Sequence, residues 1–197
     1  MEINEIRDKI CKALRSTGRN VEDLIDALDS HGFFTAPCSG GNHLCMPGGN
    51  AIHSWNVCEH ALKLAKAWLS KEDYAEMRGS VIIASLLHDY GKVGDFGKPM
   101  YIPNYLKSGK MSDNKPYKRN TKLAPVPHAV RSIKLISQAF ELTEDEEFAI
   151  MCHDGMYGEL KYVVQGAETP LYLIVHTADM WCSRFVEASG ADCGDDE

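Results

Sequence analysis

The chain has 197 residues, 44% of them hydrophobic, and a formal net charge of -7 at pH 7. Length and apolar content suit one globular domain, while the negative charge disfavours binding along extended nucleic acid but not a local basic pocket for one small anion. Because residues 1–12 carry charges throughout and no apolar run approaches about 18 residues, we expect a cytoplasmic protein with no membrane span.

Helical spacing of apolar residues predicts a succession of helices. They cover residues 3–15, 20–31, 51–70, 81–90, 127–140, 144–153 and 170–187. Glycines and prolines cluster between the second and third helices, which predicts a loop over 32–51 that contains His43.

The cysteines do not indicate a structural framework. The seven of them form an odd set without a Cys-x-x-Cys pair, which argues against both disulfide cross-links and a zinc finger. We therefore expect reduced thiols.

Residues 93–127 are the least regular part of the chain, because prolines and glycines interrupt every longer element. Their seven lysines and arginines against two aspartates give a balance of +5 in a chain of net charge -7. Loops of this length in compact domains tend to be functional or disordered. We expect a basic flap, with a short hairpin around Tyr101 to Tyr117, that closes over an anionic substrate. The alternative is a solvated, lysine-rich surface loop.

The apolar run that begins at Val81 ends in His88, Asp89, Gly91 and Lys92. An imidazole and a carboxylate at the buried end of a core helix, beside a glycine that permits a tight turn and a lysine that adds a cation, suit a metal with an anionic ligand. The alternative is a helix C-cap with a hydrogen-bonded His-Asp pair.

Other predicted helices also carry histidine or aspartate within them or at an end. The candidate ligands are His53, His88, Asp89, His128, His153 and Asp179. Nitrogen and carboxylate ligands without cysteine suit Fe, Mn, Co, Ni or Zn, with Mg as a further option. A bridging aspartate can hold two such ions about 3.5–4 Å apart, a spacing that activates water and clamps a phosphoryl group.

The order H…HD…H…H…D resembles the two-metal branch of the HD-domain superfamily of metal-dependent phosphohydrolases. The firmest anchors are Leu87-His88-Asp89-Tyr90-Gly91-Lys92 and His176-Thr177-Ala178-Asp179. Pro37-Cys38-Ser39, His43, Gly48-Gly49 and His53-Ser54-Trp55-Asn56-Val57 are also similar to the PAST…H…GG…HSLNV pattern of small HD proteins from bacteria and their phages, in which Trp55 is usually leucine.

The resemblance implies an all-α fold, a single HD-domain helical bundle over 33–187 whose irregular basic flap is 93–127. Residues 1–32 would pack on it as N-terminal helices, and 188–197 would form an acidic tail. It also implies the ligand set: Asp89 would bridge two divalent transition-metal ions, with His53, His88 and Asp179 completing one site and His128 and His153 the other.

Further residues are assigned to catalysis and substrate binding. The catalytic candidates are Asp89, Lys92 and His43, and the substrate-binding candidates are Lys92, His43, Lys115, Lys118 and Arg119. Lys92 would bind phosphate as a compact charge, and His43 would contact substrate or donate a proton. The alternatives are a solvated lysine and a histidine that satisfies loop carbonyls.

The resemblance implies hydrolysis of a phosphomonoester or phosphodiester, in a nucleotide or another small anionic molecule, by metal-activated water. One alternative is an oxygenase, because a similar site resembles the mixed-valent di-iron centres of inositol oxygenase and phosphonate-cleaving enzymes. Another is a protein that sequesters a nucleotide. Lys92 and the basic flap favour phosphate chemistry.

Overall fold

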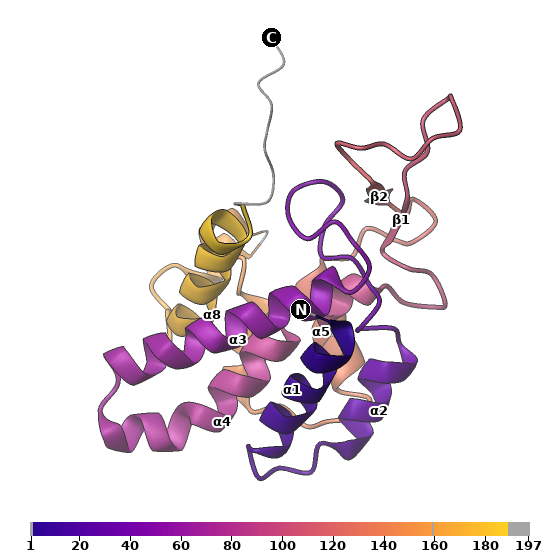
Figure 1. Cartoon of the computed structure of the whole chain (residues 1–197). Coiled ribbons are helices and arrows are strands. Elements are labelled where there is room, and N and C mark those ends of the chain that lie inside the picture. Colours follow the sequence, from indigo (N-terminus) through magenta and orange to yellow (C-terminus); the bar gives the residue numbers. More distant parts are fainter. Residues whose placement is uncertain (1, 159, 189–197) are drawn as a thin grey trace.

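The computed structural model describes residues 2–158 and 160–188 (Figure 1). Within them the chain is mostly helical, which confirms the predicted class in its coarse form, and one small sheet departs from all-α. The α-helices are α1 (Ile3–Arg15), α2 (Glu22–Ser30), α3 (Gly49–Trp68), α4 (Lys71–Leu87), α5 (His128–Ile136), α6 (Glu144–Met151), α7 (Lys161–Val164) and α8 (Pro170–Trp181). The shorter elements are the 3-10 turns η1 (Tyr90–Val93) and η2 (Gly155–Tyr157), the strands β1 (Tyr101–Pro103) and β2 (Tyr117–Arg119), and the π-helical turn η3 (Cys182–Val186).

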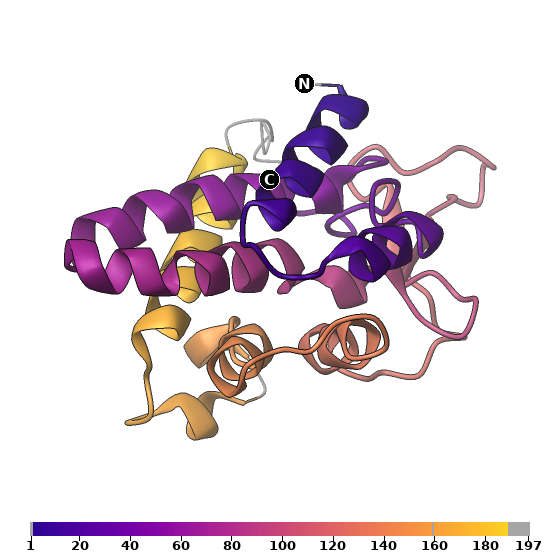
Figure 2. The ribbon, with the colours of Figure 1, turned by 90° about the horizontal axis from the view of Figure 1, so that it is seen from below.

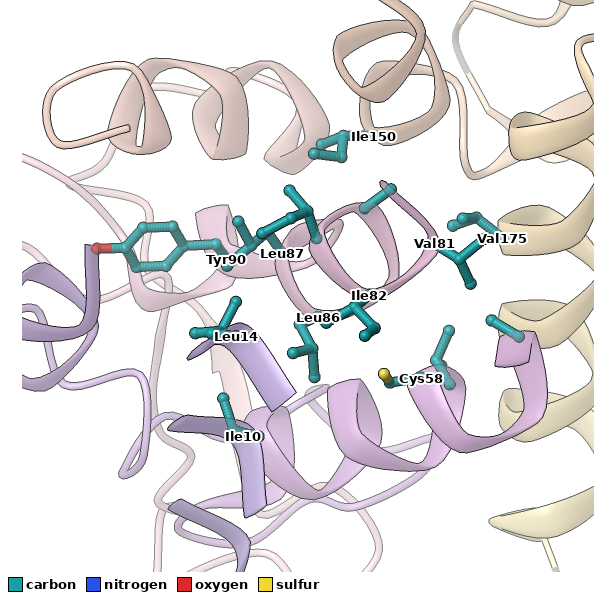
Figure 3. Packing of buried hydrophobic residues seen from close by; sticks show 14 of the residues in the cluster. Ile10, Leu14, Cys58, Val81, Ile82, Leu86, Leu87, Tyr90, Ile150 and Val175 are labelled. Carbon is teal, nitrogen blue, oxygen red and sulfur yellow. The ribbon is translucent and has the colours of Figure 1, made fainter. Parts of the chain in front are cut away.

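Helix α4 lies at the centre of the core because its second half, Val81–Leu87, is buried on every side. Helices α1, α3, α6 and α8 all contact it. Figure 2 shows α3 beside α4, with α1 crossing α3 on one side and α5 and α6 on the other side of α4. Figure 3 shows buried side chains from these helices around α4, among them Ile10, Leu14, Cys58, Ile150 and Val175. Each buried valine, isoleucine or leucine contributes roughly 1.5–3 kcal/mol to this packing.

The largest boundary difference is at α4, which begins at Lys71 rather than at the predicted residue 81. Its first half is polar and only partly buried, so the apolar run marks just the second half. The hydroxyl of Ser70 caps the true start by accepting a hydrogen bond from the Asp73 N–H at 3.0 Å.

Other helix ends agree better with the sequence patterns. Helix α1 has its predicted bounds, and α2, α3 and α6 end within about two residues of theirs. The capping box formed by Thr143 and Glu146 is confirmed. Helix α5 stops at Ile136 instead of residue 140, and α8 gives way to η3 after Trp181.

The basic flap contains the predicted hairpin. Strands β1 and β2 pair antiparallel with Tyr101 opposite Arg119. The hairpin projects from the helical body beside the glycine-rich loop that connects α2 to α3 (Figure 1). The Tyr117 N–H donates to the Gly40 carbonyl at 3.1 Å, which joins the two loops. At the base of the flap, Asp95 lies 2.6 Å from Lys134 and 3.2 Å from Arg131 of α5.

Gly91 allows α5 to dock closely against the end of α4. Its N–H donates to the Ser132 hydroxyl at 2.7 Å, and that hydroxyl donates to the His88 carbonyl at 2.8 Å. A Cβ atom at Gly91 would lie 2.7 Å from the Ser132 nitrogen, closer than real side chains approach. Glycine therefore brings the first turn of α5, with His128, next to Asp89.

Helices α1 and α2 contribute buried residues to the same hydrophobic cluster as the rest of the described chain. Beyond residue 188, the predicted acidic tail lies outside the described residues. Across the described ranges, every helix is too short or too polar to cross a lipid bilayer.

Candidate metal centre

The end of α4 brings together side chains from five separate helical segments. His88 and Asp89 follow the last turn of α4, His53 comes from α3, and Asp179 comes from α8. His128 opens α5 and His153 follows α6. The structure thus brings all the predicted ligands to one place.

One group of atoms, the first half-site, consists of His53 Nε2, His88 Nε2, Asp179 Oδ1 and Asp89 Oδ2. The two ring nitrogens are 3.2 Å apart. His53 Nε2 is 3.1 Å from Asp179 Oδ1, and both ring nitrogens are 3.4 Å from Asp89 Oδ2. His53 and His88 are fully buried, whereas 17% of the Asp179 side chain is exposed, so the half-site opens towards solvent on the Asp179 side.

The second half-site consists of His128 Nε2, His153 Nε2 and the other carboxylate oxygen of Asp89. The ring nitrogens are 3.0 Å apart, and Asp89 Oδ1 lies 3.1 Å from His128 and 3.6 Å from His153. Asp89 therefore presents one oxygen to each half-site, although the sequence shows only that the residue follows His88.

Hydrogen bonds on the outer ring nitrogens fix the orientation of three imidazoles. His88 Nδ1 lies 2.8 Å from the Ser85 carbonyl and His153 Nδ1 lies 2.7 Å from the Ile150 carbonyl. His53 Nδ1 lies 2.9 Å from a carboxylate oxygen of Glu187. Because these acceptors require a proton on Nδ1, each neutral ring directs the lone pair of Nε2 into the cluster.

This donor set fits divalent metal ions. Nitrogen lone pairs that face one another within about 3 Å need a cation or a proton between them, and neutral imidazole is the common metal-binding form. Asp89 Oδ1 is buried and has no hydrogen-bond partner, which leaves its lone pairs available to a metal. Both the arrangement of these atoms and their donor chemistry therefore suit divalent metal ions.

Electrostatics in the cluster favour cations. Burial opposes ionisation of Asp89, but Lys92 and the neighbouring histidines hold its pKa well below the ordinary value. Burial likewise opposes protonation of His153, yet the Asp89 and Asp154 carboxylates raise its pKa to about 9. The carboxylates therefore favour positive charge at His153.

Lys92 lies against the Asp89 carboxylate rather than free in solvent. Its Nζ is 2.5 Å from Asp89 Oδ2 and 3.7 Å from the Cys38 sulfur, and 13% of its side chain is exposed. Although burial disfavours the ammonium form, Asp89 raises the pKa of Lys92 well above its usual value. The chain thus holds a permanent positive charge at the first half-site.

His43 comes from the glycine-rich loop and lies at the edge of the same cluster. Its Nε2 is 3.3 Å from the Cys38 sulfur and 3.6 Å from a carboxylate oxygen of Glu187. Burial, together with repulsion from Lys92 and from His53 in its protonated form, lowers the pKa of His43 to about 4. It is therefore a neutral imidazole near pH 7.

Two acidic residues of the site were not among the predicted ligands. Glu187 is almost fully buried and orients His53, while Asn56 donates to its Oε1 at 3.0 Å. Asp154 lies 3.7 Å from both His128 Nε2 and His153 Nε2, and 43% of its side chain is exposed. Only the adjacency of Asp154 to His153 could have indicated it.

The three predicted basic substrate ligands of the flap take different positions. Arg119 lies opposite Tyr101 in the hairpin and lines a cavity beside His128. Lys118 is exposed on the other face of β2, because successive side chains alternate along a strand. Lys115 is exposed and packs against Gly41 of the glycine-rich loop. Only Arg119 of the three lines this cavity.

The remaining histidines, His31, His60 and His176, make the contacts of structural residues. His176 Nδ1 lies 2.7 Å from the His153 carbonyl, His60 Nδ1 lies 2.9 Å from the Asn56 carbonyl, and His31 lies 2.7 Å from the Tyr90 hydroxyl. The contact of His176 steadies the turn that carries His153.

Comparisons of the chain with protein-family models, curated proteins and solved structures find no match. Function is therefore inferred from the site, because a helical fold by itself is compatible with many activities.

Proposed function

We propose that this chain is a metal-dependent phosphohydrolase built on a single HD-domain helical bundle, and that it cleaves a phosphomonoester or phosphodiester of a nucleotide. The observation that carries the proposal is the position of Asp89. Its Oδ2 lies 3.4 Å from His53 and His88, and its Oδ1 lies 3.1 Å from His128. A carboxylate shared in this way suits a bridge between two divalent ions.

The proposed ligand assignment follows the two half-sites. His53, His88 and Asp179 hold one ion, His128 and His153 hold the other, and Asp89 bridges them. Ions bound there would lower the pKa of a water molecule towards about 7 and neutralise negative charge on a phosphoryl group.

The chain's own residues contribute binding and proton transfer. Lys92, held beside the first half-site by Asp89, offers a compact positive charge to a phosphate oxygen. The pKa of His43 is low because the ring is buried and, in addition, because His53 and Lys92 place positive charge beside it. An arriving phosphate would offset those charges and raise that pKa, which suits transient protonation of His43 near the substrate.

Metal analysis followed by a substrate screen tests this function. The full-length protein would be loaded separately with Mn, Fe, Co, Ni, Zn or Mg and supplied with nucleoside mono-, di-, tri- and cyclic phosphates. We expect hydrolysis that requires a metal, and loss of both bound metal and activity in Asp89→Ala. In Lys92→Ala the metal should stay while turnover falls, because Lys92 acts on the substrate.

The same screen separates the alternatives. Oxygen consumption that requires iron, without release of phosphate or nucleotide, would replace the proposal with a di-iron oxygenase. Tight nucleotide binding without turnover under any metal would replace it with a nucleotide-sequestering protein.

A further inference from the structure

A cavity of about 220 Å³ lies directly beside the second half-site. His128 and Asp154 form its edge towards the cluster, and Arg119 of β2 lines it from the hairpin. Its apolar lining includes Met100 and Met151. The cavity therefore borders the second half-site through His128 and Asp154.

The size of the cavity limits what it admits. Pockets that enclose a whole drug-sized ligand measure about 300–1,000 Å³. A volume of about 220 Å³ is smaller and suits one part of a substrate whose remaining part lies at the metal ligands.

The charges around the cavity argue against a second or third phosphate there. Arg119 contributes one positive charge and Asp154 one negative charge, so the lining lacks the excess of cations that a polyphosphate needs. The Asp154 carboxylate also lies 3.7 Å from His128, at the entrance from the cluster, where it would repel a further phosphate. It can instead accept a hydrogen bond from a hydroxyl or a ring N–H.

Tyr157 supplies an aromatic surface at the same place. Tyr157 lines the cavity, and the residue is 77% exposed, which leaves its ring accessible to a ligand. The Arg184 guanidinium lies 5.6 Å from the ring centroid and positions it from η3. Exposed aromatic rings of this kind stack on nucleobases.

We propose that this cavity binds the nucleoside part of a nucleoside monophosphate, with the base stacked on Tyr157 and a sugar hydroxyl or base N–H donating to Asp154. This inference rests on the proposed function for its phosphate end, while the nucleoside end has its own contacts. Among nucleotides the site then favours monophosphates over di- and triphosphates.

The test removes the aromatic ring and keeps the metal ligands. Tyr157→Ala would be compared with Tyr157→Phe, which retains the ring, and with Tyr162→Ala. Tyr162 is a matched control because it is 78% exposed and lies 5.2 Å from a lysine ammonium, but it does not line the cavity. Binding of the four common unphosphorylated nucleosides would be measured by calorimetry, and turnover would be measured for their 5′-monophosphates and for glycerol 3-phosphate, which has no ring.

We expect Tyr157→Ala to weaken nucleoside binding and raise the KM for nucleoside monophosphates about tenfold, since stacking on one aromatic ring typically contributes this much. Tyr157→Phe, Tyr162→Ala and all turnover of glycerol 3-phosphate should stay at the parent level. Equal nucleoside binding by Tyr157→Ala and the parent, or an equal loss in Tyr162→Ala, would overturn the inference. If nucleosides bind through Tyr157 but no phosphoester is hydrolysed, the cavity assignment stands and the proposed function fails.

Discussion

Asp89 is the residue on which both half-sites depend, because each of its oxygens faces a different pair of histidines. Asp179 approaches only the first half-site, at 3.1 Å from His53. Removing the charge of Asp89 should therefore affect metal binding at both half-sites, whereas removing that of Asp179 should affect only the first.

We predict that Asp89→Asn lowers bound metal from about two equivalents to near zero, whereas Asp179→Asn loses about one equivalent. Both changes preserve side-chain size, so helical content by circular dichroism should match the parent. Metal content of the purified variants, measured by elemental analysis, checks the prediction. A full metal complement in Asp89→Asn would contradict the bridging role.

The histidines and aspartates that cluster at the end of α4 could be selected from the sequence, because one of them closes or enters one predicted helix after another. The sequence could not reveal Glu187. In a regular α-helix the eight residues from Asp179 to Glu187 would turn the side chain about 80° away. The π turn Cys182–Val186 absorbs an extra residue and returns Glu187 to the face of Asp179, where it contacts His53.

At the scale of elements, the apolar periodicity identified the core helices but not where polar helices begin. The first half of α4 was missed because its exposed residues carry no apolar run. The flap hairpin was predicted, yet its orientation depends on strand register, which pairs Tyr101 with Arg119. The sequence alone does not give this register, and for that reason it assigns both Lys118 and Arg119 to substrate binding although they lie on opposite faces of β2.

The hairpin register gives a matched pair of variants. Arg119→Gln should raise the KM for a nucleotide substrate severalfold and flatten its salt dependence, because a charge facing the cavity is removed. Lys118→Gln removes the same charge from the opposite face and should leave both unchanged. Steady-state kinetics at low and high salt check this, and equal effects of the two variants would show that only the overall charge of the flap matters.

The base of the flap is fixed to α5 by an ion pair whose strength should depend on pH. Burial alone would raise the pKa of Asp95, but Lys134, the Phe96 N–H and Arg131 lower it below the ordinary value. At a pH between the lowered pKa of Asp95 in the folded chain and its ordinary value, this carboxyl is therefore protonated more often in the unfolded chain. Stability from Asp95 is therefore present above about pH 4 and is lost as pH falls through the lowered pKa.

We expect Asp95→Asn to lower the free energy of unfolding by about 1–3 kcal/mol at pH 7, because buried Arg131 loses its charged partner. Urea denaturation at pH 7 and near pH 3 should show the difference between variant and parent shrinking at the lower pH. Asp113→Asn, an exposed carboxylate of the same flap, serves as the control and should have no effect at either pH.

At the scale of the whole molecule, the candidate metal centre joins parts of the chain that are distant in sequence. The first half-site connects α3, α4 and α8, and the second connects α5 and the end of α6 to the same carboxylate. Each segment also packs on the core through apolar contacts. Metal binding should therefore stabilise an arrangement that packing already favours, rather than create the fold.

Metal removal should accordingly lower thermal stability without unfolding the protein at room temperature. An ion present at about 100 times its Kd adds roughly 2.7 kcal/mol, which in a domain of this size corresponds to a fall in Tm of about 5–10 °C on chelation. Calorimetric scans of the metal-loaded protein, the chelated protein and the reloaded protein measure this directly. Asp89→Asn should melt at one temperature in all three states, because it lacks the group that links the half-sites. If the parent also melts at one temperature throughout while its metal content changes, the ions bind elsewhere, and the convergence of histidines and aspartates at the end of α4 serves a different purpose.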